Sequence, residues 1–269
     1  MEMKSSLYGL KRYGMKSFLK NVFSIAVSDA VVVSFQKSGR TWLRLMLGKV
    51  LEEQYKIKRV RLDTEYMTLF KLLPNVLFSH GGCTKNNNTI DFRKVFKNKK
   101  VVVLARDPRA VMVSLFYDHT TRNLLYNGNN ISEFIRDENF GLPKVMKFMD
   151  AWGGELQQRD NILLIRYEDL YTDTPKELKR FLEFIGLTAT EEVLNRAVEY
   201  GSVKNMRKME LKNEFKDRRM LPGDTKNKNS YRTRNCKLGS FREELNKEDL
   251  DYITKLMKEQ LHPIFNYNG

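Results

Sequence analysis

The chain has 269 residues, with 48 Lys and Arg against 33 Asp and Glu, and a formal net charge of +15. This length is enough for one large α/β domain or two small ones, and the content of 41% hydrophobic and 11% aromatic residues excludes an intrinsically disordered chain. The excess positive charge predicts either an anionic ligand or high solubility, and the charge alone does not decide between them.

The cysteines and the N-terminal sequence exclude further classes of protein. Cys83 and Cys236 match neither a disulfide framework nor a CxxC metal motif, so we expect reduced thiols and a cytoplasmic protein. Residues 1–29 mix Lys and Arg with apolar residues, and no apolar run reaches the ~18–20 residues of a membrane span. We expect a basic helix there, packed on the rest of the domain; the alternative is that residues 4–26 lie on a membrane surface.

Strands and helices are predicted to alternate along the rest of the chain. Residues 30–35 contain a run of β-branched valines and predict a strand, and the apolar spacing of residues 41–55 predicts a helix after it. Residues 76–79 and 100–105 predict the next two strands, and the nearly unbroken Val and Leu of the second suit a strand buried on both faces. This alternation predicts a three-layer, doubly wound α/β fold with a mainly parallel sheet, as a single domain over residues 30–269.

The second half of the chain continues the pattern. Residues 162–166 predict another buried strand, and Thr174 and Glu177 form a capping-box sequence that begins the next helix. Asn246 is predicted to cap the last helix. Residues 212–238 are rich in Lys, Arg and Asn and predict a mobile loop that lies over a site.

Ligands of doubly wound sheets bind at the carboxyl ends of the strands, where three loops are expected: 35–41, 79–83 and 105–109. The first loop joins a strand to a helix, so its backbone N–H groups can cradle a phosphate. It is not a Walker A motif, because Lys37 precedes the only glycine, Gly39. Taken alone, this loop is more typical of an ordinary turn between a strand and a helix, with solvated Lys37 and Arg40.

The third loop carries a second set of candidate phosphate ligands. Arg106 directly follows the predicted strand, and Asp107 and Pro108 begin a helix that contains Ser114. Arginine offers a fork of donors that suits phosphate, and serine offers a hydroxyl. A plain helix cap with a buried serine explains these residues as well, so the stronger observation is that both loops occur together and in this order.

The sequences KSGRTW after one strand and RDPRAVMVS after a later one resemble the cytosolic-type, PAPS-dependent sulfotransferase family in its bacterial-like form. Three further segments share the resemblance: YEDL from Tyr167, SVKNM from Ser202 and RNCKLGSF from Arg234. The resemblance covers roughly residues 30–262. It implies an enzyme that uses 3′-phosphoadenosine 5′-phosphosulfate (PAPS), without a metal ion, to sulfate a hydroxyl or amine of a small-molecule or carbohydrate acceptor. The product of the cofactor is adenosine 3′,5′-bisphosphate (PAP).

The resemblance also implies a role for each matched segment. In the family, the first loop holds the 5′-phosphosulfate, the Arg and Ser of the third loop and the C-terminal segment hold the 3′-phosphate, and the other two segments contact the adenine. The implied catalytic residues are Lys37 and His80. The implied cofactor-binding residues are Ser38, Gly39, Arg40, Thr41, Trp42, Arg106, Ser114, Tyr167, Ser202, Arg234, Lys237 and Gly239.

The chain departs from the family pattern at four positions. Arg40 stands where the family often has Thr, and adds a positive charge beside the sulfate. Cys236 replaces a glycine and Phe241 replaces a tryptophan, which changes how the C-terminal segment closes over the 3′-phosphate. Val203 replaces a phenylalanine, and predicts weaker stacking on the adenine.

The acceptor hydroxyl needs a base, and the chain contains three histidines. His80 follows the predicted strand 76–79 and matches the family's strand–Thr/Ser–His segment, in which the histidine is the general base. An imidazole with a pKa of about 6.5 suits that role at neutral pH. His119, His262 and the carboxylate of Asp118 stay open as alternatives.

The implied reaction is an in-line displacement at sulfur, in which His80 accepts the acceptor proton and Lys37 stabilises the leaving oxygen. Two other functions stay open: a P-loop small-molecule kinase with Asp107 as a magnesium ligand, and a nucleic-acid-binding protein, suggested by the basic residues 204–242. The first lacks the GK[ST] sequence and the second lacks a recognised module. We therefore expect a sulfotransferase without a nucleic-acid partner, and the sequence predicts neither its acceptor nor its oligomeric state.

Overall fold

The structure, a computed structural model, describes residues 22–69, 71–81 and 92–267. Within these residues one parallel sheet of four strands has the order β2-β1-β3-β4. Its strands are β1 (Ala30–Val33), β2 (Val76–Ser79), β3 (Lys100–Ala105) and β4 (Ile162–Arg166). All four lie where the sequence predicts them, although β1 ends two residues earlier than expected.

The two central strands, β1 and β3, consist mainly of valine. β-Branched side chains favour the extended backbone and pack well on a pleated surface. Val31 pairs with Val101 and Val33 with Val103, and all four side chains are fully buried. Strands buried on both faces require a layer of helices on each side of the sheet.

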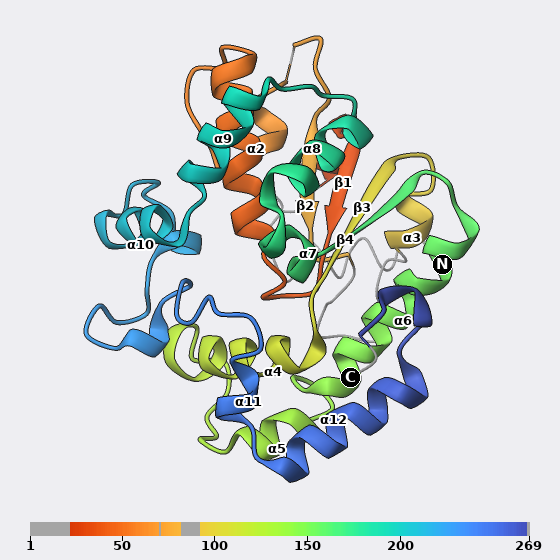
Figure 1. The fold of residues 1–269 in the computed structure, drawn as a ribbon, viewed down its shortest axis with the longest axis vertical. Helices are drawn as coiled ribbons and strands as arrows, with labels where there is room; N and C mark the ends of the chain where they lie inside the picture. Colours follow the sequence, from red (N-terminus) through yellow and green to blue (C-terminus); the bar gives the residue numbers. More distant parts are fainter. Residues whose placement is uncertain (1–21, 70, 82–91, 268–269) are drawn as a thin grey trace.

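Three helices cover one face of the sheet: α2 (Arg40–Gln54), α8 (Thr174–Ile185) and α9 (Glu191–Tyr200). Val32 and Leu104 point into this layer and belong to its apolar core. Figure 1 shows α2 and α9 side by side, next to β1 and β2.

Four helices cover the other face: α4 (Pro108–Tyr117), α5 (Ile131–Arg136), α6 (Leu142–Gln158) and α12 (Lys247–Gln260). Val103 points into this layer, which forms a second apolar core. In Figure 1, α4, α5 and α12 lie together at the lower end of the molecule.

The order of the strands determines where the connections between them change direction. After β1 the chain adds β2 on one side, and then β3 and β4 on the other side. The connections therefore reverse direction at β1, and the carboxyl end of this strand opens into a crevice that binds ligands in folds of this type. The architecture confirms the three-layer, doubly wound α/β fold that the sequence predicts.

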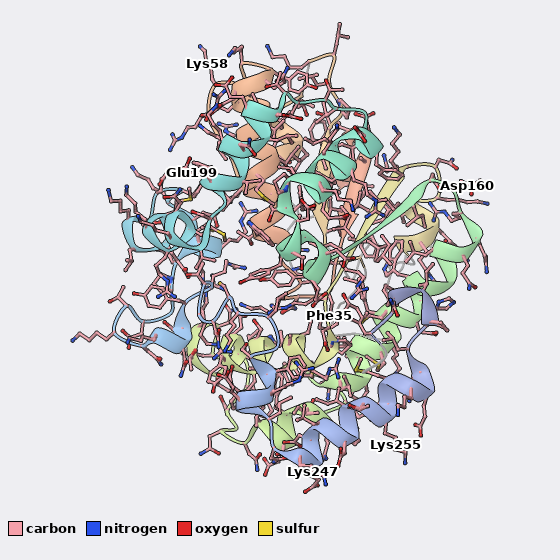
Figure 2. The ribbon with its side chains drawn as sticks, in the orientation of Figure 1. Phe35, Lys58, Asp160, Glu199, Lys247 and Lys255 are labelled. Atoms are coloured by element: carbon pink, nitrogen blue, oxygen red, sulfur yellow. The ribbon has the colours of Figure 1, made fainter. Side chains whose placement is uncertain are left out.

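Side chains follow the same division between core and surface. Phe35, just beyond β1, is buried and packs against Phe148, with ring centres 5.7 Å apart. Lys247 and Lys255 of α12 point outward, whereas Ile253 of the same helix is fully buried (Figure 2). This amphipathic pattern explains why the helix packs on the sheet along one stripe.

Shorter elements connect these layers. They are α3 (Phe92–Val95), α7 (Tyr167–Thr172), α10 (Val203–Lys212), α11 (Phe241–Glu244), the 3-10 turns η1 (Thr64–Tyr66), η3 (Arg218–Met220), η4 (Lys228–Ser230) and η5 (Pro263–Phe265), and the π-helical turn η2 (Asp118–Arg122).

The sequence predicts helix starts correctly at two of three positions. The Asp107 carboxylate accepts from the backbone N–H of Arg109 at 2.9 Å at the start of α4, and Asn246 caps α12. The capping box assigned to Thr174 is wrong, because Thr174 already lies within α8. The cap is the preceding Asp173, whose carboxylate accepts from the backbone N–H of Lys176 at 3.1 Å.

The structure describes only part of the N-terminal segment 1–29. Residues 22–27 are helical, and the Ser24 hydroxyl lies 2.8 Å from that of Tyr66, whereas residues 1–21 and Cys83 lie outside the described residues. The division of the chain at residue 30 therefore stays a prediction. No helix in the described ranges combines the length and the apolar character needed to cross a membrane.

Candidate functional site

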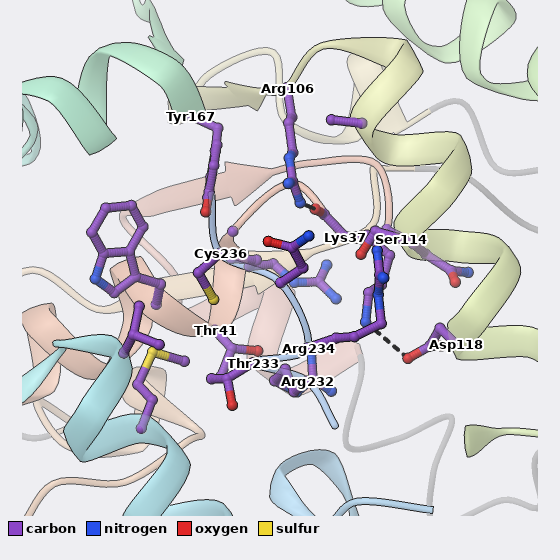
Figure 3. A pocket seen from close by; sticks show the side chains of 18 of the residues that line it. Lys37, Thr41, Arg106, Ser114, Asp118, Tyr167, Arg232, Thr233, Arg234 and Cys236 are labelled. Carbon is purple, nitrogen blue, oxygen red and sulfur yellow. Dashed lines mark hydrogen bonds and ion pairs between the residues drawn. The ribbon is translucent and has the colours of Figure 1, made fainter. Parts of the chain in front are cut away.

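A cavity of about 450 Å³ opens at the carboxyl end of β1, between the loops that follow the strands (Figure 3). Residues from the loop after β1, from α2, α4, α7 and α10, and from the segment 219–241 form its walls. The structure brings eleven of the fourteen predicted site residues into this lining: Lys37, Gly39, Arg40, Thr41, Trp42, His80, Arg106, Ser114, Tyr167, Ser202 and Arg234.

Three predicted site residues do not line the cavity. Ser38, in the first loop, is 2% exposed. The Lys237 side chain is 71% exposed, and its ammonium group pairs with Glu243 at 3.0 Å. Gly239 adopts a positive φ of 72° in the turn before α11. Lys237 is therefore held at the surface, away from the phosphate position that the resemblance implies.

The first loop has the backbone geometry of an anion cradle. Gly39 precedes α2 with a φ of 93°, and a Cβ there would lie 2.7 Å from Cδ2 of Tyr167, so only glycine fits. Lys37 also has a positive φ, of 66°, which is uncommon outside glycine. No side chain of the described residues caps the N-terminus of α2, which leaves N–H groups of its first turn available for an anion.

Lys37 and Asp118 form the central ion pair of the cavity. The Lys37 ammonium lies 2.9 Å from the Asp118 carboxylate, which also accepts from Arg122 at 3.2 Å. Burial lowers the pKa of Lys37 to about 8, although Asp118 opposes this effect. Burial alone would raise the pKa of Asp118, but Lys37 and Arg122 outweigh it and hold that pKa well below its usual range. At neutral pH both members of the pair are charged.

Arg106 joins the two predicted phosphate-binding loops. Its Nη1 donates to the backbone carbonyl of Lys37 at 2.9 Å, and its guanidinium carbon lies 4.3 Å from the centre of the Tyr167 ring. The Nε of Arg106 is buried and has no hydrogen-bond partner among the described residues. Ser114 lines the same wall, and a buried donor without an acceptor fits a phosphate group of PAPS at this position.

Aromatic and apolar side chains form the wall assigned to adenine. Trp42 and Tyr167 meet edge to face, with ring centres 5.7 Å apart. Val203 and Met206 line the cavity beside them, and Val203 is 46% exposed. The wall can hold a flat base, but it offers a branched aliphatic side chain where the family has an aromatic ring.

Of the three histidines, only His80 lines the cavity. Its Nε2 accepts a hydrogen bond from the Arg40 guanidinium, because arginine can only donate. Desolvation and the charges of Arg40 and Arg44 lower the pKa of His80 well below its usual value, so the imidazole is neutral at pH 7.

The other candidate bases are engaged elsewhere. His119 is buried against the rings of Phe134 and Phe140. The Nδ1 of His262 accepts from the backbone N–H of Ile264 at 3.3 Å, at the start of η5. Asp118 lines the cavity, but its carboxylate is committed to its cationic partners. The geometry favours His80 as the base.

The cavity also contains functional residues that the sequence did not reveal. Eight of its lining residues are cationic, whereas Asp118 is its single lining carboxylate within the described residues. The cations are Lys37, Arg40, Arg44, Arg106, Arg122, Arg219, Arg232 and Arg234. The sequence offered one signal for the missed ones, since Arg44 lies one helical turn after Arg40 and thus on the same face of α2.

This charge balance fits a polyanionic cofactor. The described residues contain no group of His, Cys, Asp and Glu arranged to hold a metal ion. The eight cationic side chains of the lining present positive charge to a phosphate or sulfate group.

Comparisons with known proteins place these features in a family. The model for the sulfotransferase domain matches residues 27–265. Sulfotransferase 2B1 of Mus musculus is 24% identical over 213 residues, which cover 73% of this chain and 61% of that protein. Cytosolic sulfotransferase 7 of Arabidopsis thaliana is 23% identical over 220 residues, which cover 68% of this chain and 65% of that protein. The matched segments thus span less than two thirds of these relatives.

Solved structures share the fold. Mouse sulfotransferase SULT7A1 complexed with PAP has a TM-score of 0.65 and 18% identity, with 87% of this chain and 84% of that chain covered. Retinol dehydratase in complex with androsterone and PAP has a TM-score of 0.59 and 18% identity, with 86% and 80% covered. Because the family model spans nearly the whole chain, and the cavity lies where this fold binds its ligands, the chain belongs to the sulfotransferase domain family.

Proposed function

We propose that the chain is a PAPS-dependent sulfotransferase that sulfates a hydroxyl or amine of a small-molecule or carbohydrate acceptor. The observation that carries the proposal is the contact between two loops at one end of the sheet. The carbonyl of Lys37, in the loop after β1 that also contains Gly39, accepts from Nη1 of Arg106 after β3, whose buried Nε has no acceptor among the described residues. Both structural neighbours, SULT7A1 and retinol dehydratase, are complexes with PAP, which supports the same cofactor.

In the proposed reaction PAPS supplies the sulfuryl group. A bond forms between the acceptor oxygen or nitrogen and sulfur, while the bond from sulfur to the 5′-phosphate oxygen breaks and its electron pair stays on that oxygen. His80 accepts the acceptor proton at Nε2, and Lys37 and the N–H groups of α2 stabilise the charge on the leaving oxygen.

Two polar contacts in the cavity must rearrange before this reaction can occur. Arg40 occupies the lone pair of His80 Nε2, so proton transfer requires Arg40 to move to another acceptor. A sulfate or phosphate oxygen beside Arg40 is the acceptor that the position of this residue in the loop favours. Similarly, Lys37 must share its ammonium protons between Asp118 and the leaving oxygen.

The proposal includes the cellular location and the nature of the acceptor. The free thiol of Cys236 and the cytosolic name of the Arabidopsis relative support a cytoplasmic protein. Androsterone and retinol, which are bound in structures of retinol dehydratase, support a small organic acceptor.

Melting temperature measured with different ligands tests the proposal. We expect PAP to raise the melting temperature in the absence of magnesium, because the chain supplies its own cations, whereas magnesium-ATP should raise it far less. Stabilisation by magnesium-ATP alone would favour the P-loop kinase, and salt-sensitive binding to any DNA duplex without an effect of PAP would favour the nucleic-acid-binding protein.

A further inference from the structure

Two arginines on one side of the cavity have no ionic partner among the described residues. Arg44 is 7% exposed, and its guanidinium carbon lies 4.7 Å from the centre of the Phe78 ring. Its Nε is buried without an acceptor, and Arg44 makes no hydrogen bond or ion pair within the described part of the chain. Arg232 donates from Nε to the backbone carbonyl of Arg219 at 2.8 Å, but forms no ion pair with any described residue.

The carboxylates nearest to Arg44 do not neutralise it. Asp63 accepts from Arg219 at 2.7 Å. Glu65 is buried, its burial raises the pKa of its carboxyl, and its Oε1 accepts from the Ser24 hydroxyl at 3.4 Å. Burial, together with the charge of Arg219, lowers the pKa of Arg44 to about 10. Because an unpaired buried charge is costly, the site gains stability when an anion binds there.

These two arginines lie on the side of the cavity that carries the proposed base. Phe78 belongs to β2 and His80 follows this strand, whereas Arg106 follows β3 on the other side of β1. Arg44, Arg232 and His80 all line the same cavity. In the view of Figure 3, Arg232 lies in the part of the pocket farther from Arg106 and Tyr167, where Thr233 and Arg234 also lie.

The proposed cofactor site already has other partners in the cavity. The proposed 5′-phosphosulfate site uses Lys37 and the start of α2, and the proposed 3′-phosphate site uses Arg106, Ser114 and Arg234. Arg44 and Arg232 remain available to the second substrate. A guanidinium group binds carboxylate, sulfate or phosphate through paired hydrogen bonds, and binds a neutral amide much more weakly.

We propose that Arg44 and Arg232 form an anion-binding subsite for the acceptor, which therefore carries a carboxylate, sulfate or phosphate group beside the hydroxyl or amine that is sulfated. This inference rests on the proposed function, since it assigns the remainder of the cavity to PAPS. It narrows the acceptor class from neutral phenols and sterols to acidic molecules, such as hydroxy acids and uronic-acid sugars.

Matched pairs of acceptors test this subsite. The probes are 4-hydroxyphenylacetate with 4-hydroxyphenylacetamide, and methyl glucuronide with its uronamide, because the members of each pair differ mainly in charge. Their binding is measured by calorimetry on the PAP-loaded protein, and their sulfation with PAPS. We expect at least one acid to bind about tenfold or more tightly than its amide, and to be the better substrate by a similar factor.

Substitutions of the two arginines test whether these residues cause the preference for acids over amides. Arg44→Gln and Arg232→Gln should each reduce the ratio between acid and amide to about threefold or less, with little change in the dissociation constant of PAP. Lys49→Gln is the control, because it removes a positive charge from the same helix outside the cavity, where Lys49 pairs with Glu52 and Glu53. Circular dichroism verifies that each variant is folded.

The outcomes separate the two proposals. Equal binding of acids and amides by the unsubstituted protein, or a preference that persists in both arginine variants, would overturn the subsite. A large loss of PAP affinity in Arg44→Gln would assign that arginine to the cofactor and also overturn it. If the unsubstituted protein does not bind PAP, the proposed function fails instead, and the acids can still be titrated against the PAP-free protein to test the arginines.

Discussion

Lys37 combines two properties that its proposed role in the transition state requires. It is held 2.9 Å from Asp118, and burial brings its pKa down to about 8, so it carries a charge at neutral pH but can share its protons readily. A cation placed at a developing negative charge contributes mainly to turnover, because the charge is greatest in the transition state.

The substitution Lys37→Ala should therefore reduce kcat about 10²- to 10³-fold. The dissociation constant of PAP should rise much less, because Arg106, Ser114 and the loop N–H groups remain. Turnover with PAPS and calorimetry with PAP give the two quantities separately. If PAP affinity and kcat/KM fall equally while kcat is unchanged, Lys37 binds the ground state and does not act in the transition state.

The titration of Lys37 and His80 predicts the pH dependence of the reaction. His80 has a pKa well below its usual value, so it stays neutral and able to accept a proton from about pH 6.5 upward. Lys37 has a pKa of about 8 and loses its charge above that pH. The value of kcat/KM should thus be highest near pH 6.5, should be reduced to about half at pH 8, and should fall further at higher pH.

Lys37→Arg provides the control for the alkaline limb, because arginine stays protonated throughout this range. Its pH profile, at whatever residual activity it retains, should lack the decline near pH 8. An unchanged decline in Lys37→Arg would assign that limb to another group.

At the scale of elements, the turn from β1 to α2 depends on Gly39. Its φ of 93°, and the 2.7 Å that would separate an added Cβ from Cδ2 of Tyr167, both exclude a larger residue. Gly39→Ala should cost about 1–3 kcal/mol of unfolding free energy and should weaken PAP binding, because either the loop or Tyr167 must shift.

Gly154 offers a matched comparison on α6. A Cβ there would meet no atom of the described residues within 4 Å, so Gly154→Ala should raise the unfolding free energy by about 0.5–1 kcal/mol. Urea denaturation measures both variants. If Gly39→Ala and Gly154→Ala change the unfolding free energy equally, a side chain at position 39 causes no strain, which would contradict this account.

The elements of the sheet are predictable because their signal is local. The runs of Val and Leu in β1 and β3 exclude a solvent-facing side, and this property alone requires helices on both faces. The sequence places the cap of α8 one residue too late, because Thr174 and Asp173 are both good capping residues and their order in the chain does not distinguish them.

At the scale of the whole molecule, the site is only partly predictable. The loops after β1 and β3 carry residues at fixed spacing, so Lys37, Arg106 and Ser114 can be identified from the sequence. Arg44 and Arg232 are 188 positions apart, and both line the cavity only because of the tertiary placement of the segment 219–241. Lys237 is the opposite case, because its place in a motif predicts a site residue. Its ion pair with Glu243 holds it at the surface instead, and the motif does not reveal this pair.

The same placement explains much of the unusual charge of the chain. Residues 204–242 hold thirteen Lys and Arg and four Asp and Glu. The structure directs Arg219, Arg232 and Arg234 from this segment into the cavity, where they face the carboxyl end of β1. Part of the excess charge is thus built into a site for anions, which ordinary solubility would not require.

The transfer of the sulfuryl group is the most direct test of the proposed function. The protein is incubated with PAPS and the paired acceptors, and sulfated product and PAP are quantified together by mass spectrometry. We predict that product and PAP form in equal amounts, and that Lys37→Ala abolishes most of both. If PAPS is not consumed with any acceptor, or if it yields PAP at the same rate without acceptor and no sulfated product, the assignment as a sulfotransferase is contradicted.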